Sequence, residues 1–187
     1  MIVRKLSDNT KVYIDRYFTI VDEMGVAMRE VAQTDSISEM YIWQNISLIS
    51  GEVQMSENIL SYTTNANIET LAKALIEDGK QAVDDLKEML EYCTNCKNEE
   101  RDVNLYQRRF AVILENMVSN MNNINLTNNI DLDYLNGLIA HHEGAIGMAK
   151  NLLNYEVCEN IRAYAENLIT THELQLGQMR QLLRILG

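Results

Sequence analysis

The three histidines are the residues of this chain whose type and spacing could do chemistry. His141 and His142 are adjacent, and His172 follows in the last segment of the chain. Neutral imidazole is the commonest protein ligand for zinc, copper, iron or nickel. Three rings that meet in one place, with one coordination position left open, would suit several of these metals. A transition-metal site is therefore the first chemistry to consider.

The segments that carry these histidines have the periodicity of α-helices. Apolar residues recur every three or four positions over 131–155 and 158–186. His142 and His172 occupy positions on the apolar seams, and His141 lies on the stripe beside that of His142. If a short turn joins the two helices, residues equally distant from it face each other. We therefore predict that His141, His142 and His172 converge in the interior.

The histidine-bearing segment is one of two similar copies. Residues 12–94 and 105–187 agree at 20 of 83 positions without a gap, which indicates a duplication. Most of the shared residues are core types. The histidines have no counterparts in the first copy: Leu48, Ile49 and Gly79 stand where His141, His142 and His172 stand in the second.

Composition and periodicity predict an all-α protein. The chain has 187 residues and no proline, and it is rich in residues that favour helices. Each copy contains three helical patterns, near 10–32, 37–62 and 66–92, and near 103–124, 131–155 and 158–186. We expect one compact domain, 1–187, made of repeat one (10–94) and repeat two (103–187). Because a three-helix unit of this size is marginal alone, the repeats should pack on each other.

The expected architecture is a ferritin-like bundle. The two long antiparallel hairpins, 37–92 and 131–186, would form a four-helix bundle, with the first helix of each repeat packed outside or across it. Ser36 and Glu39 have the spacing of a capping box at the start of the second helix, and Asn65 is the expected cap of the third. The asparagine-rich stretch 122–129 is expected to be a loop.

Charge and hydropathy exclude several classes of partner. The net charge of −11 argues against nucleic acid and anionic membranes, which would repel the chain. No apolar run approaches the roughly 18 residues that span a bilayer. The N-terminal residues turn polar early, without a signal-peptide core, so we expect a cytoplasmic protein. No arrangement of nucleophile and base, and no phosphate-binding loop, supports an enzymatic activity.

The three cysteines are expected to be reduced thiols, because their number is odd and no export signal precedes them. Cys93 and Cys96 form a lone C-x-x-C in the linker between repeats. Alternating helices would bring Cys158 to the same end of the bundle, where it could join them as a third metal ligand. A structural or incidental role and a metal or redox role both stay open.

Other candidate ligands are fewer. Carboxylate-bridged di-iron sites use Glu-x-x-His pairs, but Leu138 and Ile169 stand three residues before His141 and His172. Glu115 could fall level with His141, although it lies on the flank of its helix. Most methionines recur in both repeats and fit core filling better than copper binding. Met117 is the one methionine near enough in level to serve as a fourth ligand.

The second repeat resembles the ferritin-like domain-of-unknown-function family numbered 305. The resemblance covers about 55 residues, in the segments 133–149 and 168–179. The matching positions are His141, His142, Ala145, Met148, Ala149 and Met179. His172 stands where the family has Gln, and Gln175 where it has Glu. Some members are exported copper-binding proteins, so the resemblance implies a metal-binding or copper-handling role.

Two functions therefore follow as expectations. In the first, the bundle binds one transition-metal ion, copper or zinc, through His141, His142 and His172. In the second, it is a non-catalytic structural or protein-interaction bundle that could form a homodimer, with core histidines that are satisfied by hydrogen bonds. A histidine phosphotransfer module is a third and weaker alternative, because such modules need an exposed histidine.

Overall fold

The computed structural model describes residues 6–93 and 95–187. The first five residues, on which the signal-peptide prediction partly rests, and residue 94 lie outside this description. The described chain is all-α and contains no strand, as predicted. Its six helices are α1 (Asp8–Arg29), α2 (Ile37–Leu60), α3 (Ala66–Cys93), α4 (Glu100–Asn122), α5 (Ile130–Leu152) and α6 (Glu159–Leu186).

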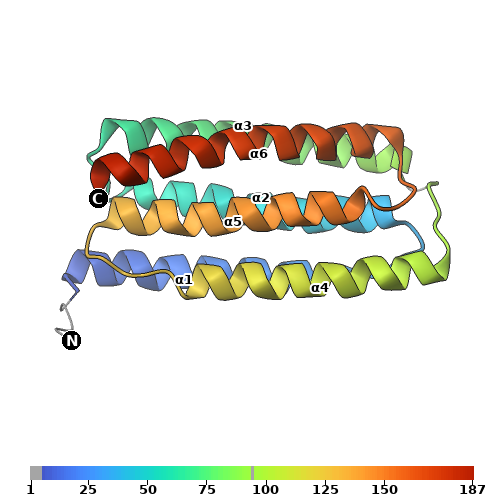
Figure 1. The fold of residues 1–187 in the computed structure, drawn as a ribbon, viewed down its shortest axis with the longest axis horizontal. Helices are drawn as coiled ribbons and strands as arrows, with labels where there is room; N and C mark the ends of the chain where they lie inside the picture. The colour runs from blue at the N-terminus through green and yellow to red at the C-terminus, as the bar shows by residue number, and fades with distance from the viewer. Residues whose placement is uncertain (1–5, 94) are drawn as a thin grey trace.

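The helices form three layers of two (Figure 1). The helices α2 and α5 make the central layer, covered on one side by α3 and α6 and on the other by α1 and α4. The two predicted long hairpins are present as α2–α3 and α5–α6. The first helix of each repeat runs along the outside of this four-helix group rather than across it (Figure 1). The ferritin-like assignment stays a prediction.

Helix ends follow the predicted caps in part. The Ser36 hydroxyl accepts a hydrogen bond from the backbone N–H of Glu39 at 3.2 Å. The reciprocal half of a capping box is replaced, because the Ser36 N–H donates to the Thr34 hydroxyl. Asn65 caps α3 by accepting from the N–H of Asn67 at 2.9 Å. These bonds satisfy backbone donors that have no partner inside a helix.

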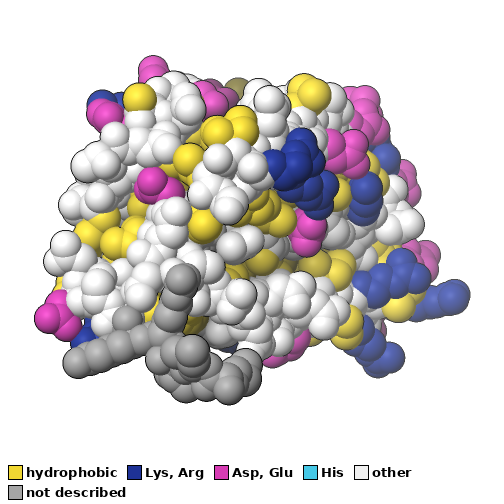
Figure 2. All heavy atoms as spheres, turned by 60° about the vertical axis from the view of Figure 1, so that its left-hand side comes forward, with side chains coloured by type: hydrophobic (Ala, Val, Ile, Leu, Met, Phe, Trp, Pro, Cys, Tyr) yellow, Lys and Arg dark blue, Asp and Glu magenta, His cyan; other side chains and the backbone are white. Residues whose placement is uncertain are grey.

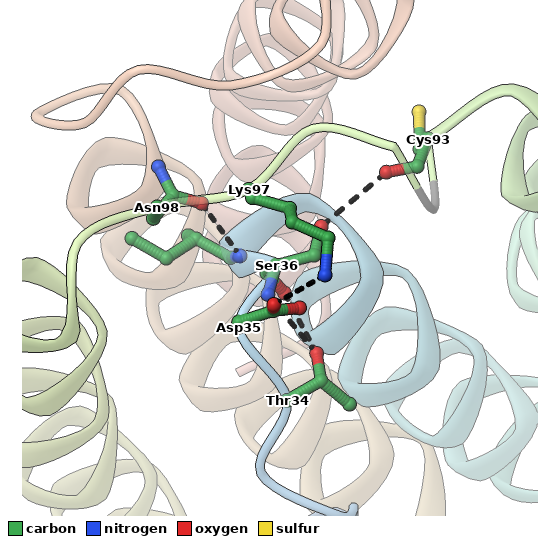
Figure 3. Close-up of polar contacts among 7 residues, drawn as sticks. Thr34, Asp35, Ser36, Cys93, Lys97 and Asn98 are labelled. Atoms are coloured by element: carbon green, nitrogen blue, oxygen red, sulfur yellow. Dashed lines mark hydrogen bonds and ion pairs between the residues drawn. The ribbon is translucent and has the colours of Figure 1, made fainter.

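One end of the bundle joins segments that are distant in sequence (Figure 3). The Asn98 side chain accepts a hydrogen bond from the backbone N–H of Ile37 at 2.9 Å. It also donates one to the carbonyl of Glu156 at 2.6 Å. Lys97 pairs with Asp35 beside it. The linker between α3 and α4 thereby holds the start of α2 and the α5–α6 turn together.

The cysteine prediction was wrong for two of the three residues. Cys96 and Cys158 form a disulfide, with Cα atoms 6.0 Å apart, and Cys93 is a free, buried cysteine. The prediction did place Cys158 at the same end of the bundle as the linker. An odd number of cysteines leaves one unpaired, but it does not prevent the other two from pairing when the fold brings them together. The disulfide also removes Cys96 and Cys158 as candidate metal ligands.

Several contacts in the first three helices recur in the last three, 93 positions higher. The matched contacts are Met24 on Gly51 with Met117 on Gly144, and Asn58 to the Tyr13 carbonyl with Asn151 to the Tyr106 carbonyl. Equivalent contacts of this kind are what a duplicated unit predicts. The division into repeats 10–94 and 103–187 stays a prediction, which these contacts support.

No helix in the described part of the chain is long and apolar enough to cross a membrane.

Candidate metal centre

The central layer brings a carboxyl group and two imidazoles together in the interior. Glu52 lies on α2, and His141 and His142 lie on α5; all three are buried, with Glu52 5% exposed. The Glu52 Oε1 atom is 3.4 Å from Nδ1 of His142 and 3.9 Å from Nδ1 of His141. One ligand atom from each residue lies within 4.8 Å of the others. This is a spacing at which one metal ion could be held.

Burial controls the charge of this group. Burial, with Asp78 as a smaller cause, raises the pKa of Glu52 to about 8. Burial lowers the pKa of His141 to about 3 and that of His142 to about 4. The short Glu52–His142 contact is therefore a protonated carboxyl facing a neutral imidazole at pH 7, not an ion pair. Neutral imidazole is the form that binds metals.

A backbone hydrogen bond fixes the orientation of His141. Its Nε2 atom lies 3.1 Å from the carbonyl oxygen of Leu48 on α2. Because a carbonyl only accepts, Nε2 carries the proton and Nδ1 keeps its lone pair. Nδ1 has no hydrogen-bond partner and is turned toward Glu52. Metal-binding histidines usually have their other ring nitrogen held in this way.

His142 contacts an acceptor at each ring nitrogen. Nδ1 is 3.1 Å from the carbonyl of Leu138, and Nε2 is 3.0 Å from Oε1 of Gln175 on α6. A neutral ring has one N–H, so it can donate to only one of them. The Gln175 amide can accept through oxygen or donate through nitrogen, and its two orientations are set by the hydrogen-bond network. His142 can therefore carry its proton on either nitrogen.

The third histidine lies beside the second. The rings of His142 and His172 have centroids 4.3 Å apart, and those of His141 and His142 are 5.8 Å apart. The structure thus brings all three predicted residues together, as the hairpin geometry indicated. Nδ1 of His172 is buried without a partner, and burial lowers the pKa of this ring to about 2. His172 does not belong to the tight group that Glu52 completes.

Glu52 was missed by the sequence analysis. It belongs to the first repeat, which contains no histidine, and it reaches the histidines across the contact between α2 and α5. A signal was present, because Glu52 aligns with Ala145, a core position of the second repeat. The alignment predicts that Glu52 is buried as well, and a carboxyl group is rarely buried without a functional or structural reason.

A cavity of about 200 Å³ opens beside the centre, between α3 and α6. Helices α3 and α6 pack only sparsely on each other. Gly79 and Ala82 on α3 are the counterparts, in the first repeat, of His172 and Gln175 on α6. All four line the cavity, so one wall has short side chains and the other has long ones. Glu52 also lines the cavity. The centre is therefore buried but borders on space that is open to solvent.

The two other candidate ligands, Glu115 and Met117, both lie on α4. Glu115 is exposed and forms an ion pair with Arg29 of α1, with 3.0 Å between Oε1 and Nη2. Glu115 is therefore committed to the surface on the opposite side of the bundle. Met117 packs against Gly144, on the face of α5 that is turned toward α4. No histidine is visible on the face drawn in Figure 2, where hydrophobic patches lie among uncharged polar groups and most basic side chains gather on one side.

A family model described as "Domain of unknown function (DUF305)" matches residues 49–183. The match begins in α2, just before Glu52, and runs to the last turns of α6, so it includes every residue of the centre. It also extends well beyond residues 133–149 and 168–179, which carry the resemblance. No curated protein and no solved structure matches the chain. The chain therefore belongs to the DUF305 family, whose defining domain is one of unknown function.

Proposed function

We propose that this protein binds one transition-metal ion, copper or zinc, between α2 and α5. The proposed ligands are Glu52, His141 and His142, with His172 as the adjoining imidazole on the side of the cavity. One observation carries the proposal: the buried Oε1 of Glu52 and the buried Nδ1 of His141 face each other without hydrogen-bond partners. Buried polar atoms without partners are uncommon in folded proteins.

The donor set suits these metals. Two imidazole nitrogens and a carboxylate oxygen are ligands that zinc and copper accept. An unpaired carboxyl group in an apolar interior destabilises the fold. When ionised it is a desolvated charge, and its raised pKa reflects the free energy needed to ionise it. A bound cation would offset that cost by replacing the proton on Glu52. The histidines are already neutral, so they need lose no proton to bind.

Gln175 supports the same proposal. Coordination through Nδ1 of His142 requires that the ring proton sit on Nε2. There the Gln175 oxygen, at 3.0 Å, is placed to accept it. Gln175 would act as a positioning residue, since accepting the Nε2 proton leaves Nδ1, 3.4 Å from Oε1 of Glu52, without a proton.

Calorimetric titration with Zn²⁺ and Cu²⁺ tests the proposal. We expect about one equivalent to bind to the wild-type chain and expect no stoichiometric binding to the double variant Glu52→Gln, His141→Ala. Glu57→Gln is the matched control, because Glu57 lies five residues further along α2, is exposed and pairs with Lys80. Undiminished binding to a folded double variant would reject the site.

The alternative function is a non-catalytic structural or protein-interaction bundle with core histidines. The carbonyls of Leu48 and Leu138 favour it, because each gives a buried ring a partner within its own core. In that case the metals would leave the melting temperature of the wild-type chain unchanged.

A further inference from the structure

We propose that the cavity between α3 and α6 is the route by which a metal cation reaches Glu52 from solvent, with the Asp78 carboxylate as its first contact. This inference rests on the proposed metal-binding function and adds an entry path to it. The class of ligand is a hydrated divalent cation.

The position of the cavity supports a route. It is lined by Glu52, which belongs to the buried centre, and by Asp78, which is exposed. His172 and Gln175 line it as well, and both lie against His142. The cavity therefore borders on the candidate ligands at one end and on solvent at the other. Its volume of about 200 Å³ holds several waters, which a partly hydrated ion needs.

The charge of the lining selects for cations. The Asp78 carboxylate and the protonated carboxyl group of Glu52 line the cavity, and no lysine or arginine does. Three other hollows of the described surface differ in this respect. Each includes a basic side chain: Lys80 and Lys87 in one, Arg108, Arg109 and Lys150 in the second, and Arg29 in the third. A cleft lined by one sign of charge concentrates ions of the opposite sign.

Small residues on α3 keep the path open. Gly79 faces α2 so closely that an added Cβ would lie 2.7 Å from Val53 and 3.2 Å from Ile49. The glycine lets α3 approach α2, and this brings neighbouring Asp78 to the edge of the cavity. Ala82 lies one turn further along and lines the same space. A larger side chain at position 82 would occupy the route without removing any proposed ligand.

Stopped-flow mixing with Cu²⁺ tests the route, with quenching of the intrinsic fluorescence as the signal. We expect Ala82→Leu to slow association at least tenfold while the stoichiometry at equilibrium stays that of the wild type. The matched control is Ala74→Leu, which changes an exposed alanine of α3 outside the cavity lining. It should bind at the wild-type rate.

A charge variant gives a second measurement that does not depend on how position 82 repacks. Asp78→Asn should slow association severalfold at low salt, and this difference should shrink at high salt because salt screens exposed charges. Glu77→Gln removes the same charge from the neighbouring exposed residue, which does not line the cavity. It should have little effect.

The outcomes separate the route from the site. Equal association rates for Ala82→Leu and Ala74→Leu, within twofold, with normal binding at equilibrium, would overturn the route and leave the metal site intact. Equal rates for Asp78→Asn and Glu77→Gln would remove Asp78 from the route. If the wild-type chain binds no Cu²⁺ at equilibrium, the proposed function and the route both fall.

Discussion

Glu52 and His142 lie on different hairpins, and 3.4 Å separates the Oε1 atom of the first from the Nδ1 atom of the second. This contact crosses between α2 and α5, and both of its residues are buried. Burial raises the pKa of the Glu52 carboxyl group and lowers the pKa of the His142 ring. The charge state of the centre therefore depends on pH in a way that stability measurements can detect.

The metal-free protein should be most stable near pH 6.5. The lowered pKa values of His141, His142 and His172 mean that the unfolded chain binds more protons below about pH 6.5, so stability rises with pH up to that value. The pKa of Glu52 is raised from 4.5 to about 8, so the folded chain retains a proton that the unfolded chain releases. Stability should therefore fall again between about pH 6.5 and 8.

Thermal melts of the wild type and of Glu52→Gln across this pH range measure how much the ionisation of Glu52 contributes to the pH dependence of stability. The melting temperature of the wild type should fall relative to that of the variant between pH 6 and 8, because the variant has no carboxyl group to ionise. Parallel curves would mean that Glu52 does not hold a proton in the folded chain.

Glycines on the central helices should be intolerant of alanine. Alanine normally stabilises a helix interior by about 1 kcal/mol relative to glycine. At Gly51 and Gly144, however, the new methyl group would overlap the side chains of Met24 and Met117. We expect Gly51→Ala and Gly144→Ala each to lower the free energy of unfolding by about 1–3 kcal/mol, as overpacking does.

Gly177→Ala is the control for these variants, because nothing lies within 4 Å of the added carbon on α6. It should raise the free energy of unfolding by a few tenths to about 1 kcal/mol. Denaturant unfolding measures all three. A gain in stability at Gly51 or Gly144 would show that the methionines give way easily.

The Cys96–Cys158 disulfide should contribute substantially to stability. It closes a loop with a sequence separation of 62 and ties the linker to the start of α6. Cross-links of this kind typically contribute about 2–4 kcal/mol. Reduction should therefore lower the melting temperature of the wild type, whereas the variant Cys96→Ser, Cys158→Ser should start lower and not respond to reductant. Identical melts of the two proteins would indicate that the bond does not persist in solution.

The part of the site within one hairpin could be predicted from the sequence, and the part between hairpins could not. His142 and His172 face each other because the α5–α6 turn fixes which residues are level. Glu52 joins them only through the way in which α2 docks on α5, and helical periodicity does not specify that docking. The cysteines illustrate the same limit, since their pairing depends on where the linker meets the α5–α6 turn.

Helix positions were predicted well for a related reason. Periodicity and caps such as Ser36 and Asn65 are local, and the chain contains no proline to interrupt them. To predict the layers, one must also know which helix of each repeat can be buried on both of its faces. In the structure α2 and α5 take this central place, and both are rich in buried residues.

Elemental analysis of the untagged protein tests the central claim most directly. Plasma mass spectrometry would report metal per chain for the wild type, for Glu57→Gln and for Glu52→Gln, His142→Ala, each after reconstitution with Cu²⁺ or Zn²⁺ and removal of excess metal. The account predicts about one equivalent in the first two proteins and almost none in the third. Negligible metal in all three, or an equal content in all three, would contradict it.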